Sequence, residues 1–233
     1  SLMRVHVARP VMDGPWPGLI FYSDIYQLGD PILRLAHRLA GYGFVVAAPE
    51  IFHRVEPVGT VIEPDAIGRL RGNDAARRTE IASYDADAQA VLAWLREQAV
   101  VDQERLGAVG FCIGGHLAFR AAFRPAVRAT ACLYPTGLQN GKLGRGVADS
   151  LQRAGEIKGA LFTLFGSEDP HVPAEDRERV LEALRGLRHE TVLFEANHTF
   201  MRDDGWRWDP DLADQAWAAV ITFLRRELSP AQL

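Results

Sequence analysis

Residues 105–116 read RLGAVGFCIGGH, a short apolar run followed by a glycine-rich turn and the start of a helix. The pattern Gly-x-Cys-x-Gly-Gly within it is the cysteine version of a nucleophile elbow, the sharp strand-to-helix turn of many hydrolases. Side chains two positions before and after Cys112 would collide in such a turn, which explains Gly110 and Gly114. A buried structural cysteine in a glycine-rich turn is the alternative. The glycine spacing does not fit the dinucleotide fingerprint Gly-x-Gly-x-x-Gly.

Apolar strand-like runs alternate with helix-period segments on both sides of this turn. A chain of this kind forms a mostly parallel sheet with helices on both faces. We expect one α/β domain over residues 1–233, with the ligand crevice beyond the carboxyl ends of the strands. The expected strands are residues 18–22, 44–48, 105–109, 127–133, 160–165 and 190–194, and the expected helices are 31–42, 79–98, one from Gly114, 173–187 and 211–228.

Composition narrows the class of partner. The 233 residues include 26 Lys and Arg against 30 Asp and Glu, a formal net charge of −4. This balance argues against nucleic acid or an anionic membrane as the main partner, because both require clustered positive charge. With two cysteines, no long apolar run and no secretory signal at the start, the sequence predicts a cytoplasmic protein without disulfides. A monomer is the default expectation.

Two further reactive residues follow later strands. Asp169 lies in the turn after residues 160–165, and His198 follows residues 190–194. Nucleophile, acid and histidine is the chain order of hydrolases with this topology, so we predict a Cys112–His198–Asp169 triad. His171 is a competing base, but it follows the acid too closely to face it across the crevice. No zinc-type spacing of ligands occurs, and we predict no metal.

The chain resembles the dienelactone hydrolase family, a branch of the α/β-hydrolases with a cysteine nucleophile. The resemblance is carried by residues 110–115, 166–173, 197–202 and 19–54, the last ending in Pro49-Glu50-Ile51-Phe52. It implies an α/β-hydrolase fold and hydrolysis of enol-lactones such as dienelactone, without a cofactor.

The same resemblance implies roles for further residues. The backbone N–H groups of Ile25 and Ile113 would form the oxyanion hole, and Arg202 would hold a substrate carboxylate. A second such arginine belongs in the segment before residue 79, where Arg69 is slightly favoured over the other candidates. Those other candidates are Arg71, Arg77 and Arg78.

One residue departs from the family pattern. Where the family has a glutamate that hydrogen-bonds the resting thiol, this sequence has Asp24. The missing methylene displaces the carboxylate by about 1.5 Å. Asp24 is therefore expected to activate the nucleophile through a changed geometry, or the substrate differs.

The predicted activity is hydrolysis of enol-lactones or activated carboxylic esters through a thioester intermediate. A thiolate leaves easily, so a good leaving group on the substrate is needed for the reaction to go forward. The alternatives on the same triad are a broad-specificity esterase, thioesterase or phosphotriesterase. Outside this class remain a non-catalytic ligand-binding protein on a hydrolase fold and a redox-sensing thiol protein.

Overall fold

A computed structural model describes residues 1–229 of the chain. Seven strands form one sheet in the order β1-β3-β2-β4-β5-β6-β7. Strand β1 pairs antiparallel with β3, and every other neighbouring pair is parallel. The strands are β1 (Val5–Ala8), β2 (Trp16–Tyr22), β3 (Val45–Pro49), β4 (Val101–Phe111), β5 (Val127–Leu133), β6 (Ala160–Gly166) and β7 (His189–Phe194).

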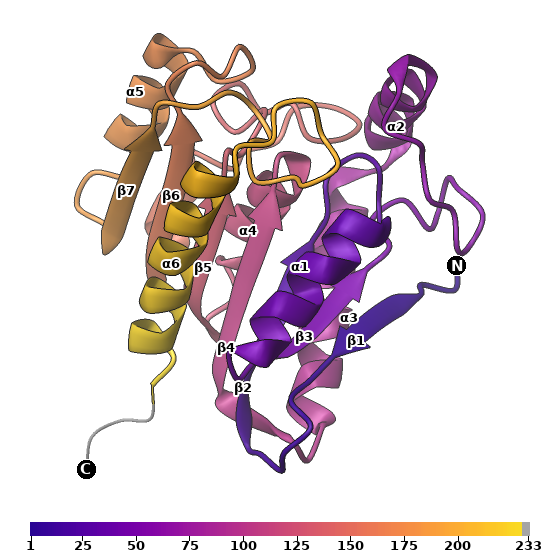
Figure 1. Ribbon diagram of the computed structural model, residues 1–233, viewed down its shortest axis with the longest axis vertical. Coiled ribbons are helices and arrows are strands. Elements are labelled where there is room, and N and C mark those ends of the chain that lie inside the picture. Colours follow the sequence, from indigo (N-terminus) through magenta and orange to yellow (C-terminus); the bar gives the residue numbers. More distant parts are fainter. Residues whose placement is uncertain (230–233) are drawn as a thin grey trace.

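Helices cover both faces of this sheet (Figure 1). They are α1 (Asp30–Gly41), α2 (Ala66–Arg78), α3 (Ile81–Glu97), α4 (Ile113–Ala121), α5 (Ala174–Ala183) and α6 (Pro210–Glu227). Helices α1 and α6 lie on one face, with α3, α4 and α5 on the other. The predicted α/β-hydrolase fold, with a mostly parallel sheet between two helical layers, is confirmed.

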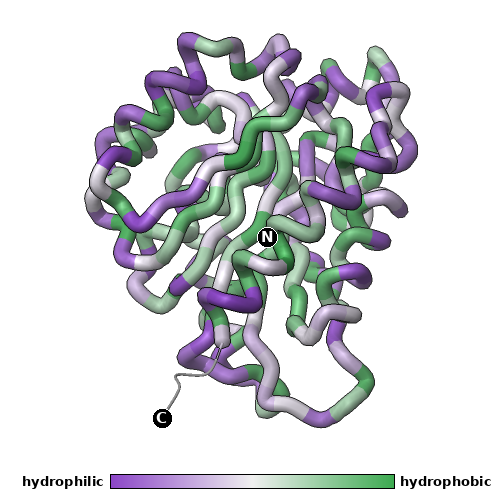
Figure 2. Tube along the Cα trace, turned by 60° about the vertical axis from the view of Figure 1, so that its left-hand side comes forward, coloured by the Kyte–Doolittle hydropathy of each residue, from purple (hydrophilic) through white to green (hydrophobic). Residues whose placement is uncertain are grey.

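Two apolar cores hold the layers together, one on each face of the sheet. Strand β2 serves both cores because successive side chains point to opposite faces. Leu19 and Phe21 pack toward α1 and α6, whereas Ile20 and Tyr22 pack toward α3 and α4. Figure 2 shows the central strands as apolar along most of their length, as expected where helices cover both faces.

One strand and one α-helix of the fold were not expected from the sequence. Strand β1 has four residues at the sheet edge, too few for a clear alternating pattern. Helix α2 lies in a stretch that lacks apolar periodicity, because its buried residues are Gly68, Gly72, Ala75 and Ala76. Its start is nevertheless marked by Asp65, whose side chain accepts a hydrogen bond from the Gly68 N–H at 2.7 Å.

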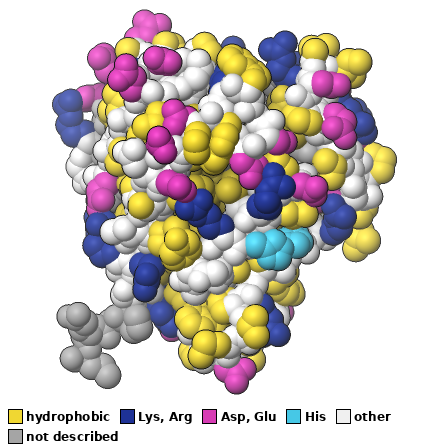
Figure 3. All heavy atoms as spheres, in the orientation of Figure 1, with side chains coloured by type: hydrophobic (Ala, Val, Ile, Leu, Met, Phe, Trp, Pro, Cys, Tyr) yellow, Lys and Arg dark blue, Asp and Glu magenta, His cyan; other side chains and the backbone are white. Residues whose placement is uncertain are grey.

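The surface carries charges of both signs. Figure 3 shows basic and acidic side chains interspersed with apolar ones over the face that α1 and α6 cover. Within residues 1–229, no helix has the combination of length and apolar character needed to span a bilayer.

Candidate active site

The turn at Cys112 has the backbone conformation of a nucleophile elbow. Cys112 lies between β4 and α4 with φ 57° and ψ −121°, a conformation that residues with a side chain rarely adopt. A Cβ on Gly110 would lie 2.0 Å from the Gly114 carbonyl oxygen, and one on Gly114 would lie 2.3 Å from the Ser23 carbonyl oxygen. The two glycines therefore allow the close approach that leaves Cys112 half-buried at the carboxyl edge of the sheet.

His198 and Asp169 meet at the same edge. Strands β6 and β7 are parallel neighbours, so the loops after them lie side by side. His198 Nδ1 donates to Asp169 Oδ2 at 2.6 Å, and both side chains are buried. Burial alone would lower the pKa of His198, but the negative charge of Cys112 and the bond to Asp169 raise it to about 9. The raised pKa reflects the stabilisation of a His198 imidazolium by these two negative partners.

The two residues predicted to supply the oxyanion donors line the same pocket as Cys112. Ile113 is the first residue of α4, where the helix offers its N–H groups no internal partner. Ile25 lies in the turn after β2, and the Asp24 carboxylate closes this turn by accepting from the Tyr26 N–H at 2.9 Å. Helix α2 supports the turn from outside, since a Cβ on Gly72 would lie 2.5 Å from the Ile25 carbonyl oxygen.

Asp24 and Arg202 form a buried ion pair. Arg202 Nη1 donates to Asp24 Oδ2, and Arg202 Nε donates to Asp204 Oδ1 at 2.6 Å. Burial raises the pKa of Asp24, and the adjacent Arg202 guanidinium opposes this rise. The structure thus brings Asp24 into the same pocket as Cys112 but in contact with Arg202. The roles of Asp24 in activating the thiol and of Arg202 in binding a carboxylate stay predictions.

Cys112 and His198 line a pocket of about 860 Å³ between the strand ends, α2 and the loop after β5. Arg69 is exposed on its wall, whereas Arg71 is paired with Glu56 at 2.6 Å and does not line it. The basic side chains on this wall include Arg69, Arg77, Lys142, Arg202 and Arg207. The same wall also carries the carboxylates of Asp24 and Asp176.

Three residues around Cys112 and His198 were missed or set aside by the sequence reasoning. The Thr136 hydroxyl lies 3.6 Å from the Cys112 sulfur. The Tyr134 ring packs against His198 with centroids 5.2 Å apart, and the His171 ring does so at 4.6 Å. The segment 134–136 follows β5, which lies between the strands of the nucleophile and the acid. The rule that located Asp169 and His198 would therefore have located Thr136.

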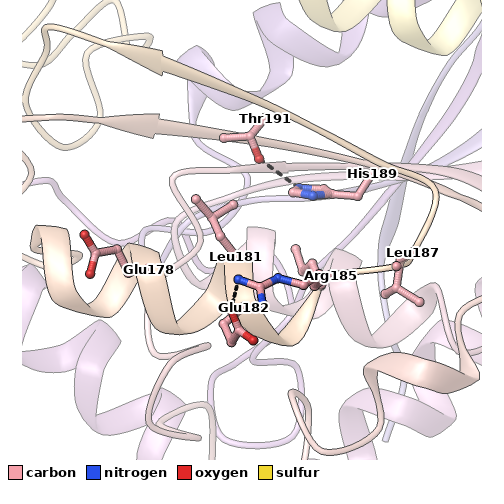
Figure 4. Close-up of a pocket in the computed structure, with 9 residues that line it drawn as sticks. Glu178, Leu181, Glu182, Arg185, Leu187, His189 and Thr191 are labelled. Atoms are coloured by element: carbon pink, nitrogen blue, oxygen red, sulfur yellow. Dashed lines mark hydrogen bonds and ion pairs between the residues drawn. The ribbon is translucent and has the colours of Figure 1, made fainter.

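A second pocket, of about 720 Å³, lies between α5 and β7 (Figure 4). Arg185 on its wall pairs with Glu182, and His189 bonds the Thr191 hydroxyl at 2.9 Å. None of the predicted site residues lines it. Among residues 1–229, no group of three or more His, Cys, Asp or Glu side chains is arranged to hold a metal ion.

The elbow, the acid–histidine pair and the order of the strands together define an α/β-hydrolase. The sequence pattern of the Dienelactone hydrolase family matches residues 3–228. A putative carboxymethylenebutenolidase of Saccharomyces cerevisiae is 34% identical over 88% of this chain and 78% of its own length. The chain belongs to the dienelactone hydrolase family and is a carboxylic ester hydrolase, which confirms the predicted family and enzyme class.

Solved structures agree on the fold. A putative dienelactone hydrolase from Klebsiella pneumoniae has a TM-score of 0.77 at 23% identity, covering 97% of this chain and 100% of its own. A dienelactone hydrolase-like promiscuous phosphotriesterase from metagenomic libraries has a TM-score of 0.74 at 20% identity, with coverage of 98% and 100%.

Proposed function

We propose that the chain hydrolyses enol-lactones or similarly activated esters through a thioester on Cys112, with His198 and Asp169 completing the triad. The observation that carries this proposal is the left-handed conformation of Cys112, which presents its sulfur to the pocket with the His198–Asp169 pair beside it. The carboxymethylenebutenolidase name of the yeast relative supports the lactone as substrate.

In the first half of the reaction, the Cys112 thiolate attacks the ester carbonyl. The Ile25 and Ile113 N–H groups stabilise the oxyanion that forms, with each donor contributing about 3 kcal/mol. The intermediate then collapses and the carbon–oxygen bond breaks as the thioester forms; in a lactone the ring opens and the enolate stays attached to the acyl group, whereas in an open-chain ester it leaves. The enolate takes a proton from the His198 imidazolium and tautomerises to the ketone.

In the second half, His198 is neutral and acts as a general base. It accepts a proton from a water molecule that attacks the thioester carbonyl, while Asp169 stabilises the returning imidazolium. The carbon–sulfur bond breaks, which releases the acid and restores the thiolate. Because thiolate is a better leaving group than an alkoxide, simple alkyl esters would return to substrate in the first half.

The experiment compares substrates and nucleophile variants. Steady-state rates would be measured with dienelactone, an aryl ester and an aryl phosphotriester, with Cys112→Ala as the control. Mass spectrometry during turnover should find an acyl group on Cys112 that disappears as substrate is exhausted. Hydrolysis of dienelactone that survives Cys112→Ala would overturn the proposed nucleophile.

A second candidate function is hydrolysis of activated neutral esters or phosphotriesters. The observation that favours it is the pairing of Arg202 with two carboxylates, which leaves one of the two predicted carboxylate-binding arginines already neutralised. The dienelactone hydrolase-like phosphotriesterase with the same fold also supports this candidate. A rate with the aryl phosphotriester or the aryl ester far above that with dienelactone would favour this candidate.

A further inference from the structure

A buried polar network lies behind the nucleophile elbow and takes no part in the reaction just described. The His116 side chain on α4 is fully buried, with Nε2 2.7 Å from the Ser150 hydroxyl and Nδ1 3.3 Å from the Thr136 carbonyl oxygen. Arg120 on the same helix donates to the Ser150 hydroxyl at 3.1 Å. The network therefore connects α4 to two points, Thr136 and Ser150, of the loop between β5 and β6.

The direction of each hydrogen bond follows from the chemistry of the groups. A carbonyl oxygen only accepts, so His116 Nδ1 carries the proton that bonds Thr136. Burial, followed by the charge of Arg120, lowers the pKa of His116 to about 3, so the ring is neutral and Nε2 is an acceptor. Ser150 then donates its hydroxyl proton to Nε2 and accepts one from Arg120. Every polar atom in this network has a defined role.

Arg120 is itself fixed by carboxylates from two other segments. Its Nε and Nη2 bond both oxygens of Asp85 on α3 at 2.8 Å and 2.6 Å, and its Nη1 bonds Asp149 at 2.8 Å. Bidentate pairing of this kind restricts the guanidinium to one orientation. The network therefore runs from the fixed Arg120 guanidinium to the backbone carbonyl of Thr136.

Thr136 contacts the nucleophile residue twice. Its N–H donates to the Cys112 carbonyl oxygen at 3.1 Å, and its hydroxyl lies 3.6 Å from the Cys112 sulfur. A thiolate has no proton to donate, so the hydroxyl is the donor whenever Cys112 is ionised. Asp24, the acid predicted to contact the sulfur, is engaged by Arg202 and Tyr26 instead.

We propose that Thr136 is a positioning residue for Cys112, that its hydroxyl stabilises the thiolate, and that the network Arg120–Ser150–His116 holds it in place. This inference rests on the proposed role of Cys112 as nucleophile. The other titratable side chains around the sulfur are His198, Tyr26 and Tyr134, whose environments all include the Cys112 charge. The Thr136 hydroxyl adds an uncharged hydrogen-bond donor next to the Cys112 sulfur.

The test measures the thiol without any substrate. Iodoacetamide alkylation and ultraviolet thiolate absorbance would be followed against pH in the wild type, Thr136→Val and Thr136→Ser. The second cysteine, Cys132, is fully buried, and burial raises the pKa of its thiol, so alkylation of the folded protein reports on Cys112. Thr136→Val keeps the shape of the side chain but removes the hydroxyl, and Thr136→Ser keeps the hydroxyl.

We expect the alkylation rate of Thr136→Val, measured on the acid side of the Cys112 titration, to be about tenfold lower than that of the wild type at the same pH, the loss expected for one hydrogen bond to a charged group. The titration of Cys112 should move to higher pH in this variant, and Thr136→Ser should stay within about twofold of the wild type. Circular dichroism and urea unfolding would show that both variants fold. An unchanged titration in a folded Thr136→Val protein would overturn the proposal.

Ser150→Ala tests the network as a unit. It removes the link between Arg120 and His116 while leaving Arg120 bonded to Asp85 and Asp149. We expect slower alkylation in Ser150→Ala alone and no further slowing when it is added to Thr136→Val, because its effect passes through Thr136. Additive losses in alkylation rate, or no loss in Ser150→Ala alone, would show that the network does not hold Thr136 in place. Loss of the proposed hydrolysis is separately visible in Cys112→Ala, so the two failures are distinguishable.

Discussion

Arg202 and Asp24 are 178 residues apart in the sequence and form a buried ion pair in the wall of the pocket that contains Cys112. Breaking a buried pair by removing one partner costs about 3–5 kcal/mol, because the other charge is left without compensation. Arg202→Ala should lower the free energy of unfolding by this amount in urea denaturation. Since burial raises the pKa of Asp24, the deficit should shrink as the pH falls and Asp24 takes up a proton.

The matched control for this prediction is Arg34→Ala. Arg34 bonds Asp203 with two hydrogen bonds, at 2.8 Å and 2.6 Å, but the pair is exposed. Exposed pairs contribute about 0–1 kcal/mol, so this variant should unfold almost as the wild type does. Equal losses in the two variants would contradict the burial argument.

Arg69 is predicted to bind the acidic group of the substrate. Arg69→Ala should raise KM about tenfold for a lactone that bears a carboxylate, equivalent to about 1.4 kcal/mol, and leave KM for a neutral aryl ester unchanged. Arg71→Ala is the control on the same helix, because Arg71 is paired with Glu56 and does not line the pocket. A rise in KM for both esters alike would argue against a carboxylate-binding role.

Gly72 holds α2 against the turn that presents the Ile25 N–H. A methyl group there would lie 2.5 Å from the Ile25 carbonyl oxygen, so Gly72→Ala should displace the turn and lower kcat. A displacement of ~1 Å costs on the order of 100-fold in rate. Gly41→Ala on α1 meets nothing within 4 Å and should leave kcat unchanged. Full activity in Gly72→Ala would contradict the predicted role of the Ile25 N–H in the oxyanion hole.

The pKa of His198 should lie well above the ordinary value for a histidine. NMR of the imidazole nitrogens should find His198 protonated at neutral pH, with a midpoint near its pKa of about 9. The Cys112 charge and the hydrogen bond to Asp169 both raise the pKa of His198. The midpoint should therefore fall in Cys112→Ala and in Asp169→Asn. A wild-type midpoint near 6.5, the ordinary value for histidine, would mean that no thiolate–imidazolium pair forms.

His116 should make the fold sensitive to acid. Its pKa is lowered to about 3 in the folded state and is about 6.5 when unfolded, so its contribution to stability is complete above pH 6.5 and is lost as the pH falls toward 3. Between pH 7 and pH 5 the loss should be about 2 kcal/mol. Urea unfolding of the wild type and His116→Gln at both pH values isolates this loss, because the variant lacks it. The same pH dependence in both proteins would contradict the assignment.

Much of the fold was accessible from local patterns. Strand 127–133 was predicted with its observed bounds, and the helix expected over 31–42 spans Asp30–Gly41. Gly43, just beyond the end of this helix, adopts φ +93°. Helix α2 was missed because it buries glycine and alanine, which leave no apolar period to detect.

The sequence by itself determined the sheet, the glycine turn around Cys112 and the order in which the reactive residues follow their strands. These depend on spacing along the chain, on backbone sterics at Gly110 and Gly114, and on the common edge that parallel strands share. Only the tertiary structure decided which partners the charged and hydroxyl groups choose. Arg202 pairs with Asp24, and Thr136 reaches the sulfur, because contacts between distant segments depend on distances that one-dimensional spacing does not contain.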